Sequence, residues 1–371
     1  MNQRARLHVV HTEASLGWGG QEIRILTEAR GMIARGHEIE LLCPADARIC
    51  AEAPNYGVPV TALPIGRKNL RGVIAMRRQL ARRRCDVINS HSSTDSWLAA
   101  VACAASPSAP PLVRTRHISA AIPDNLATRW LYQRATRGIV TTGERLREQL
   151  VRDNGFDPAR IVSVPTGVDT ARYHPDPGDR DAARRQLGLP ARVPIVGIVA
   201  TLRSWKGHRY LLDAFARLPD RSTRLVIVGD GPQRAALEQK IPALGLADRV
   251  VLAGHQSDVA PWLRCFDVFA LPSYANEGVP QAIVQAMLTA LPVVTTDIGS
   301  IGEAIQSGST GLMVAPENAT ALAAALQTLL GDASLRERLG TAARAAALQK
   351  FSLDAMLDRM EVVFEAAAAH V

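Results

Sequence analysis

The chain has 371 residues, the length of about two domains, and its 47% hydrophobic and 21% charged residues are ordinary for a protein with large buried cores. This composition excludes a disordered, collagen-like or coiled-coil chain, and the aromatic content of only 4% argues against a nucleic-acid partner bound by base stacking. The formal net charge of +8 is concentrated in residues 61–152, where 16 Lys and Arg stand against 5 Asp and Glu, so this region is expected to have an anionic partner.

Short apolar runs alternate with amphipathic stretches along most of the chain, beginning with a predicted strand over 7–11 and a helix over 21–35. The other predicted strands of the first half are 39–43, 87–89, 112–115, 139–142 and 161–164. Those of the second half are 194–200, 225–228, 250–253, 268–271, 293–295 and 312–314. Strands rich in Val, Ile and Leu with helices between them are typical of parallel sheets that are covered on both faces. The predicted fold class is therefore α/β, with two doubly wound domains facing each other across a cleft.

The alternation is interrupted once, by a stretch rich in Pro, Gly and Asp over 165–179. The predicted domains are therefore residues 1–170 and residues 171–351. The Ala-rich tail, 352–371, is expected to form a helix that packs back toward the N-terminal domain.

Glycines follow the first predicted strand, where Gly19 and Gly20 open a helix. Such a loop lets backbone amides approach a phosphate. The third glycine of a dinucleotide-binding fingerprint is replaced by Glu22 here, and by Arg234 in the second glycine loop, so NAD is not expected.

The segment 67–84 carries eight cations and no acid around the apolar residues Leu70, Val73, Ile74, Met76 and Leu80. Cations that flank an apolar stripe suit an anionic membrane surface, and an ordinary solvated helix is the alternative. Nucleic acid is a third option, but no known nucleic-acid-binding motif accompanies the charge, so no nucleic-acid partner is expected. The five scattered cysteines and the lack of a long apolar stretch near the N-terminus predict a cytoplasmic protein. The basic segment 67–84 adds the expectation that it is peripheral at the inner face of the membrane.

Two loops after predicted strands carry charged residues suited to catalysis. Lys206, one of only four lysines, lies with Arg203 in a strand-to-helix loop, where both could neutralise a leaving diphosphate. Glu277 stands just before a predicted helix, and Gln285, eight residues on, is expected to face the same side two helical turns away.

In their order and spacing, these motifs resemble the retaining glycosyltransferases of the two-domain GT-B fold, family 4. The resemblance covers nearly the whole chain. It rests on Gly19-Gly20 with 36–38, 164–169 with 173–175, Lys206-Gly207, 225–231, 266–273, Glu277-Gly278, 299–303 and 308–312. This sequence has Thr201 where the family usually has an arginine, and Gln285 where it usually has a second glutamate.

The resemblance implies that the N-terminal domain binds the acceptor and the C-terminal domain binds a nucleotide-diphosphate-sugar. It implies catalytic roles for His117, Lys206 and Glu277, with His91 and Arg116 on the acceptor side. The implied donor-binding residues are Gly19, Gly20, Arg203, Lys206, Gly254, His255, Glu277, Gly278, Val279, Pro280, Gln281 and Gln285. No cofactor and no metal are expected, because the Asp-x-Asp pattern of a metal site occurs only at Asp179 and Asp181, in the linker.

The expected acceptor is a glycan or a lipid-linked glycan of the kind used in bacterial surface polysaccharide or lipopolysaccharide synthesis. Two alternatives stay open at this stage. One is a nucleotide-sugar epimerase of the same fold, and the other is an inactive relative that only binds nucleotide or acts as a scaffold.

Overall fold

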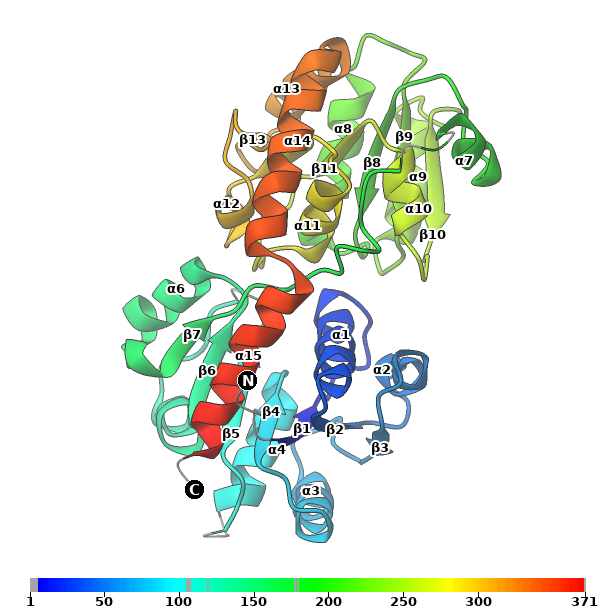
Figure 1. Cartoon of the computed structure of the whole chain (residues 1–371). Coiled ribbons are helices and arrows are strands. Elements are labelled where there is room, and N and C mark those ends of the chain that lie inside the picture. The colour runs from blue at the N-terminus through cyan, green and yellow to red at the C-terminus, as the bar shows by residue number, and fades with distance from the viewer. Residues whose placement is uncertain (1–5, 105–107, 119, 177, 179, 370–371) are drawn as a thin grey trace. The chain divides into compact units, whose positions relative to one another are not determined.

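A computed structural model describes residues 6–104, 108–118, 120–176, 178 and 180–369. The chain forms two compact units (Figure 1): unit 1 is Met1–Gly167 with Leu353–Val371, and unit 2 is Val168–Ser352. The sequence predicts these boundaries after residues 170 and 351.

Unit 1 contains a seven-stranded parallel sheet in the order β3-β2-β1-β4-β5-β6-β7. Its strands are β1 (His8–Thr12), β2 (Glu38–Cys43), β3 (Val60–Ala62), β4 (Val87–Ser90), β5 (Leu112–Arg116), β6 (Gly138–Thr141) and β7 (Ile161–Ser163). Its helices are α1 (Gly20–Ala34), α2 (Arg48–Glu52), α3 (Leu70–Arg82), α4 (Ser93–Ala104), α5 (Leu126–Arg129), α6 (Glu144–Asn154) and α15 (Leu353–Ala368). A π-helical segment, η2 (Trp130–Ala135), and two 3-10 segments, η1 (Ala53–Tyr56) and η3 (Pro158–Arg160), complete it.

Unit 2 contains a six-stranded parallel sheet in the order β10-β9-β8-β11-β12-β13. Its strands are β8 (Ile195–Val199), β9 (Arg224–Val228), β10 (Val250–Gly254), β11 (Val268–Leu271), β12 (Val293–Thr296) and β13 (Leu312–Val314). Its helices are α7 (Arg180–Gln186), α8 (His208–Ala216), α9 (Arg234–Ala243), α10 (Ala260–Cys265), α11 (Gln281–Leu288), α12 (Ile301–Ala304), α13 (Ala319–Gly331) and α14 (Ala333–Lys350). A short 3-10 segment, η4 (Ser204–Lys206), follows β8.

Successive residues of the unit 1 strands enter two different cores, as expected for a sheet covered on both faces. Val9 of β1 and Leu41 of β2 belong to one buried cluster, whereas the next residues, Val10 and Leu42, belong to another. This alternation follows from the two-residue period of a strand. It confirms the predicted class of doubly wound parallel sheets.

The prediction from sequence missed β3, which is an edge strand of three residues. Its residues are half-buried or exposed, and Thr61 interrupts its apolar character. A short edge strand lacks the continuous apolar run that marks a strand buried on both faces. Only pairing with β2 identifies it.

The C-terminal helix α15 belongs to unit 1, where it packs on α1 and on the sheet at β4 and β5 (Figure 1). The contact is close because a Cβ atom on Gly31 would lie only 2.5 Å from Leu357. Arg35, the residue after the end of α1, also pairs with Asp358 of α15 at 2.8 Å.

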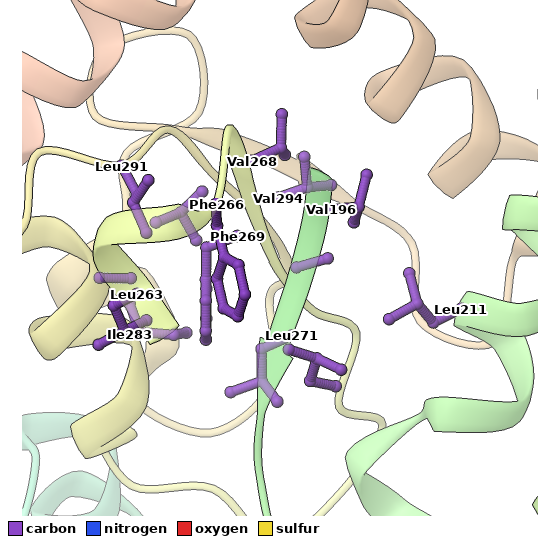
Figure 2. Close-up of a cluster of buried hydrophobic side chains, with 14 of the residues drawn as sticks. Val196, Leu211, Leu263, Phe266, Val268, Phe269, Leu271, Ile283, Leu291 and Val294 are labelled. Carbon is purple, nitrogen blue, oxygen red and sulfur yellow. The ribbon is translucent and has the colours of Figure 1, made fainter. Parts of the chain in front are cut away.

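In unit 2, buried side chains from β8, β11 and the neighbouring helices form one core (Figure 2). Phe266 and Phe269 lie together in it, near Leu263 and Ile283. Gly197 of β8 makes room for Phe266, because a Cβ atom there would approach the ring to 2.0 Å.

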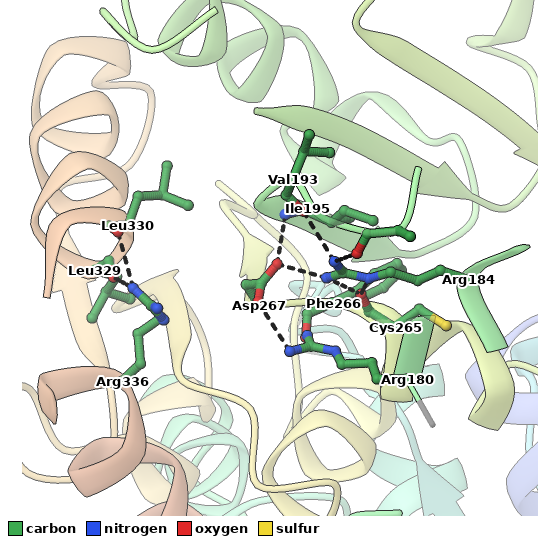
Figure 3. Close-up of polar contacts among 11 residues, drawn as sticks. Arg180, Arg184, Val193, Ile195, Cys265, Phe266, Asp267, Leu329, Leu330 and Arg336 are labelled. Atoms are coloured by element: carbon green, nitrogen blue, oxygen red, sulfur yellow. Dashed lines mark hydrogen bonds and ion pairs between the residues drawn. The ribbon is translucent and has the colours of Figure 1, made fainter. Parts of the chain in front are cut away.

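A buried arginine joins the beginnings of β8 and β11 (Figure 3). The Arg184 guanidinium donates to the Cys265 carbonyl at 2.8 Å and to the Asp267 carboxylate at 2.8 Å, and Asp267 also accepts from the Ile195 amide at 2.7 Å. These bonds connect the N-terminal ends of β8 and β11. The loops after the C-terminal ends of the same two strands contain Lys206 and Glu277.

Candidate functional site

Each sheet reverses its strand order once, between β1 and β4 in unit 1 and between β8 and β11 in unit 2. In open parallel sheets, ligands bind beyond the carboxyl ends of the strands at such a reversal. A ligand-binding site is therefore expected in the loops after these four strands.

In unit 2, the loops after β8 and β11 bring Lys206 and Glu277 together, as a predicted shared site requires. The Lys206 Nζ lies 2.6 Å from Glu277 Oε1, and Ser273 Oγ donates to the same oxygen at 2.6 Å. Glu277 is buried and Lys206 is half-buried. The prediction from sequence missed Ser273 as a site residue, although it lies two residues after a predicted strand.

Glycines allow these loops to approach one another. A Cβ atom at Gly207 would lie 1.9 Å from the Pro272 carbonyl oxygen, and one at Gly299 would lie 1.9 Å from the Glu277 carbonyl oxygen. Both glycines have positive φ, at 77° and 56°, which favours glycine over other residues. Loops from three adjacent strands, β8, β11 and β12, thus pack around Glu277.

The predicted helical register between Glu277 and Gln285 is wrong. Glu277 lies in a loop, and α11 begins only at Gln281, after Pro280. The eight residues therefore do not form two helical turns. Gln285 is buried, and its Nε2 donates to the Tyr173 hydroxyl at 3.1 Å.

The remaining predicted donor residues differ in their surroundings. Arg203 is exposed, and its guanidinium carbon lies 5.7 Å from the centroid of the Trp205 ring. Gly278 and Pro280 are buried beside Glu277, and the side chain of Val279 belongs to the core, so that Val279 has only its backbone to offer a ligand.

Gly254 is the last residue of β10, and His255 follows it; β10 is two strands away from β8 in the sheet. His255 is exposed. The Gly254 carbonyl accepts a hydrogen bond from the Gly229 amide at 2.8 Å, so these residues adjoin the loop after β9. Their predicted role in donor binding stays a prediction.

In unit 1, three histidine side chains form a hydrogen-bonded row across β1, β4 and β5. His11 Nδ1 lies 2.9 Å from His91 Nε2, and His91 Nδ1 lies 3.0 Å from His117 Nε2. Burial lowers the pKa of each of the three, that of His11 to about 3. The row is therefore neutral near pH 7. The prediction from sequence included His91 and His117 but missed His11, although it ends the predicted first strand.

A buried aspartate holds the middle of this row. The Asp95 carboxylate accepts from the Thr12 hydroxyl at 2.7 Å, from the His91 amide at 2.9 Å and from the Ser92 amide at 2.9 Å. The backbone around His91 is thereby fixed to β1.

The predicted glycine loop lies at the start of α1, with Gly19 as the residue before the helix and Gly20 as its first residue. Glu13 lies under the loop, where it accepts from the Ser15 amide at 2.7 Å and from the Gln21 side chain. Burial, with Asp95 and Glu22 nearby, raises the pKa of Glu13 to about 8. Glu13 is thus largely protonated near pH 7 and adds little negative charge to the loop.

Arg116, predicted on the acceptor side, ends β5 immediately before His117. It is buried, and it donates to the Tyr132 hydroxyl at 3.1 Å and to the Ile118 carbonyl at 3.2 Å.

Among the residues described, no group of three or more His, Cys, Asp or Glu side chains is arranged to hold a metal ion. Of the acidic pair in the linker, Asp179 lies outside the described residues, and Asp181 lies 3.7 Å from Arg192. The described helices include none that is long and apolar enough to span a membrane.

Two family models match the chain. The model for Glycosyltransferase Family 4 matches residues 18–172, and the model for Glycosyl transferases group 1 matches residues 193–332.

Individual proteins agree with these matches. A D-inositol 3-phosphate glycosyltransferase of Rhodococcus opacus is 33% identical over 85% of this chain and 78% of that protein. A 2-deoxystreptamine glucosyltransferase of Streptomyces kanamyceticus is 28% identical over 84% of this chain and 89% of that protein. The structure of Anabaena HepE in complex with UDP-glucose superposes with a TM-score of 0.87 at 24% identity, covering 97% of this chain and 100% of that one, and so has the same fold.

Proposed function

This chain belongs to the GT-B glycosyltransferases of family 4, and from that premise we propose that it is a retaining enzyme with a nucleotide-diphosphate-sugar as donor. The acceptor is a hydroxyl of a glycan or lipid-linked glycan, in the synthesis of a bacterial-type surface polysaccharide or lipopolysaccharide. The complex of HepE with UDP-glucose supports a donor of this class.

The contact between Lys206 and Glu277 at the reversal of the unit 2 sheet carries this proposal. A lysine ammonium has three N–H donors, and one of them is directed at Glu277. The other two are available to the departing diphosphate, together with the exposed Arg203. Stabilising the charge on that leaving group is the main catalytic contribution we assign to these residues.

Glu277 and His117 have the sugar as their proposed partner. The Glu277 oxygen that accepts from Lys206 and Ser273 is occupied, so its second carboxylate oxygen is the one we assign to a sugar hydroxyl. His117 is half-buried at the end of the histidine row, where it can bond to the sugar. Attack from the face that the diphosphate leaves gives retention, and no metal is needed because cationic side chains balance the charge.

The test of the donor site is Lys206→Ala, which we expect to lower turnover at least about a hundredfold, the scale of losing one charge-stabilising group. Lys240→Ala is the matched control, because Lys240 also pairs with a carboxylate in unit 2, that of Asp213 at 2.8 Å. Turnover of Lys206→Ala within threefold of the wild type would contradict the assignment.

Incubation of the wild-type enzyme with nucleotide-sugars, without acceptor, separates the proposal from its two alternatives. Slow release of free sugar and nucleoside diphosphate supports a transferase. Interconversion of two nucleotide-sugars would identify an epimerase. Binding without reaction would identify a scaffold, the alternative that is favoured by Thr201 and Gln285 standing where the family usually has Arg and Glu. The anomeric configuration of the product, measured by NMR, decides between retention and inversion.

We also propose that the enzyme works in the cytoplasm and binds the anionic inner face of the membrane through residues 67–84. In α3, Met76 is buried and Val73 is half-buried, but Leu70 and Ile74 of the predicted apolar stripe are exposed, at 73% and 40%. Of the cations beside them, Arg77 and Arg78 form no ion pair with any residue that the structure describes. Exposed apolar residues among unpaired cations are the features that bind acidic lipid. All five cysteines are free thiols, which supports a reducing compartment.

Sedimentation with vesicles tests the membrane proposal. The double variant Arg77→Gln/Arg78→Gln should bind acidic vesicles roughly thirtyfold more weakly, since each charge near the surface contributes about 1 kcal/mol. Arg217→Gln/Arg221→Gln, which removes two exposed arginines of unit 2, is the control. Equal binding by both variants, or no binding by the wild type at low salt, would contradict the proposal.

A further inference from the structure

Unit 1 contains a cavity of about 340 Å³, a volume within the range of small-molecule sites, at the amino ends of β5 and β6. Its lining includes Leu112, the first residue of β5, and Arg137, the residue before β6. The predicted acceptor-side and catalytic residues Arg116 and His117 lie at the other end of β5. Four residues of extended chain span about 13 Å, so this cavity is separate from the predicted catalytic site.

The walls of this cavity are largely apolar. Apart from three arginines, they consist of small or apolar side chains of α4, η2 and the connection into β5, such as those of Ala100, Pro111 and Leu112. Cys103 also lines the cavity, and burial raises the pKa of its thiol to about 11, so the thiol carries no charge near pH 7. Walls of this kind favour a ligand with an apolar body over a bare inorganic ion.

Three arginines, Arg134, Arg137 and Arg160, make the cavity positively charged, and its lining includes no carboxylate. Arg134 and Arg137 are exposed, and their side chains form no hydrogen bond or ion pair with any residue that the structure describes. Their N–H groups are therefore open to a ligand. A guanidinium can bind a carboxylate through two parallel hydrogen bonds, so these two residues favour an acid.

Arg160 differs from the other two arginines, because its donors are already used. Its guanidinium donates to the carbonyls of Gln133 and Thr136, and to that of Arg137 at 3.2 Å. These carbonyls lie in η2 and in the two residues that lead from it into β6. Arg160 therefore fixes the segment that carries Arg134 and Arg137, and it adds a third positive charge.

The segment η2 connects this cavity with the acceptor side of unit 1. It is a π-helical turn of six residues, a rare geometry that is frequent at functional sites. Its first residue, Trp130, lines the cavity and stacks on Trp97 of α4, with 5.9 Å between the ring centroids. Two residues further on, the Tyr132 hydroxyl accepts a hydrogen bond from Arg116 at 3.1 Å. A ligand that orders η2 should therefore also order Tyr132 and Arg116.

We propose that this cavity is a second ligand site, which binds a small carboxylic acid with an alkyl chain. The carboxylate of the ligand pairs with Arg134 and Arg137, and its chain lies against the apolar walls. The arginines select an anion, and the walls select an anion with an apolar body. Because the cavity lies at the opposite edge of the sheet from the predicted catalytic residues, its ligand is neither the donor nor the acceptor.

Isothermal titration of the whole protein with octanoate tests the site directly. Arg134→Met/Arg137→Met, a double change at exposed positions where folding is not at risk, should weaken octanoate binding at least about tenfold, because charge-assisted hydrogen bonds are lost. Octylammonium has a similar chain and the opposite charge, so it should bind the wild type at least about tenfold more weakly than octanoate does. Octanol, which is uncharged, should bind the wild type and the double variant equally. Undetectable octanoate binding by the wild type, or equal binding of octanoate and octylammonium, would overturn the inference.

Two control variants show whether octanoate binds elsewhere in unit 1. Arg71→Met/Arg82→Met removes two exposed arginines of the basic helix α3. Lys68→Met removes an exposed cation that lines a different cavity. Both variants should bind octanoate as the wild type does. If either one weakens binding as much as Arg134→Met/Arg137→Met does, the site is not the one that we propose.

Amide hydrogen exchange then locates the ligand within the fold. Octanoate should slow the exchange of the η2 amides, including that of Tyr132, and of the Arg116 amide, because a bound ligand stabilises the segments that it contacts. The slowing should be absent in Arg134→Met/Arg137→Met. Slowing that is confined to α3 or to unit 2, or that persists in the double variant, would overturn the inference. These measurements need neither donor nor acceptor, so their outcome is independent of the proposed function.

Discussion

The hydrogen-bonded row of His11, His91 and His117 determines which nitrogen of His117 carries its proton. A neutral imidazole has one N–H and one acceptor nitrogen, so both bonds of the row must run in the same direction. His11 Nε2 is buried without a partner among the described residues. Because an unpaired buried N–H is rarer than an unpaired acceptor, the proton of His11 belongs on Nδ1. His117 then accepts from His91 and presents an Nδ1–H to a ligand.

The row predicts that His11 affects catalysis without touching substrate. His11→Phe should lower kcat about tenfold with little change in the KM for donor, because His117 would lose its fixed tautomer. His11→Asn, whose Nδ2 can replace the donor at Nδ1, should recover much of that loss. Steady-state kinetics on both variants checks this, and equal activities of His11→Phe and His11→Asn would show that His11 only fills space.

Glu13 makes the stability of the protein depend on pH. The pKa of Glu13 is raised from 4.5 to about 8 in the folded chain, so the folded state binds this proton more tightly than the unfolded chain does. The resulting stabilisation is complete below about pH 4.5, the ordinary pKa of the group. That contribution falls as the pH rises and is lost once the pH passes through about 8. Glu28, whose pKa burial raises to about 7, acts with the same sign.

Glu13→Gln should therefore flatten the decrease in stability between pH 7 and pH 9. The expected difference from the wild type is on the order of 1 kcal/mol, or about 2–4 °C in Tm. Thermal unfolding across this range measures it, with the exposed Glu148→Gln as the control. A wild-type pH profile in Glu13→Gln would mean that Glu13 is ionised in the fold.

At the scale of elements, the close contact of α1 with α15 completes unit 1. These helices are more than 300 residues apart in sequence, and the absence of a side chain at Gly31 lets Leu357 approach. Several side chains of α15, including Met356 and Phe364, belong to the core cluster of that face.

Gly31→Val should lower the free energy of unfolding by about 1–3 kcal/mol, the usual cost of overpacking a core. Gly331→Val, at the end of α13, should cost less because no atom lies within 4 Å of its Cβ position. Chemical denaturation of the two variants tests the difference. A Gly31→Val protein as stable as the wild type would show that Leu357 moves aside freely.

At the scale of the whole molecule, the two units have separate hydrophobic cores. Calorimetry should therefore resolve two components. Gly31→Val should lower only the component of unit 1, and Gly197→Ala, which would drive a Cβ atom into the Phe266 ring, should lower only that of unit 2. A single transition that both variants lower equally would show that the units unfold together.

A nucleoside diphosphate should raise the unit 2 component of the same calorimetric trace. At one hundred times its dissociation constant, the gain is about 2.7 kcal/mol. Lys206→Ala should reduce that gain.

The amino-acid sequence determined the α/β class and the positions of most strands, because a strand buried on both faces needs a continuous apolar run, as in β11 and β12. It also placed Lys206, Glu277, His91 and His117 after strands, which in a parallel sheet means at one edge. Their proposed roles stay predictions.

Tertiary structure alone decided which of these residues meet. The order of strands depends on packing between segments far apart, so the sequence did not indicate that His11 bonds to His91 or that Ser273 shares an oxygen of Glu277 with Lys206. The partner of Gln285, the Tyr173 hydroxyl, comes from a segment 112 residues away.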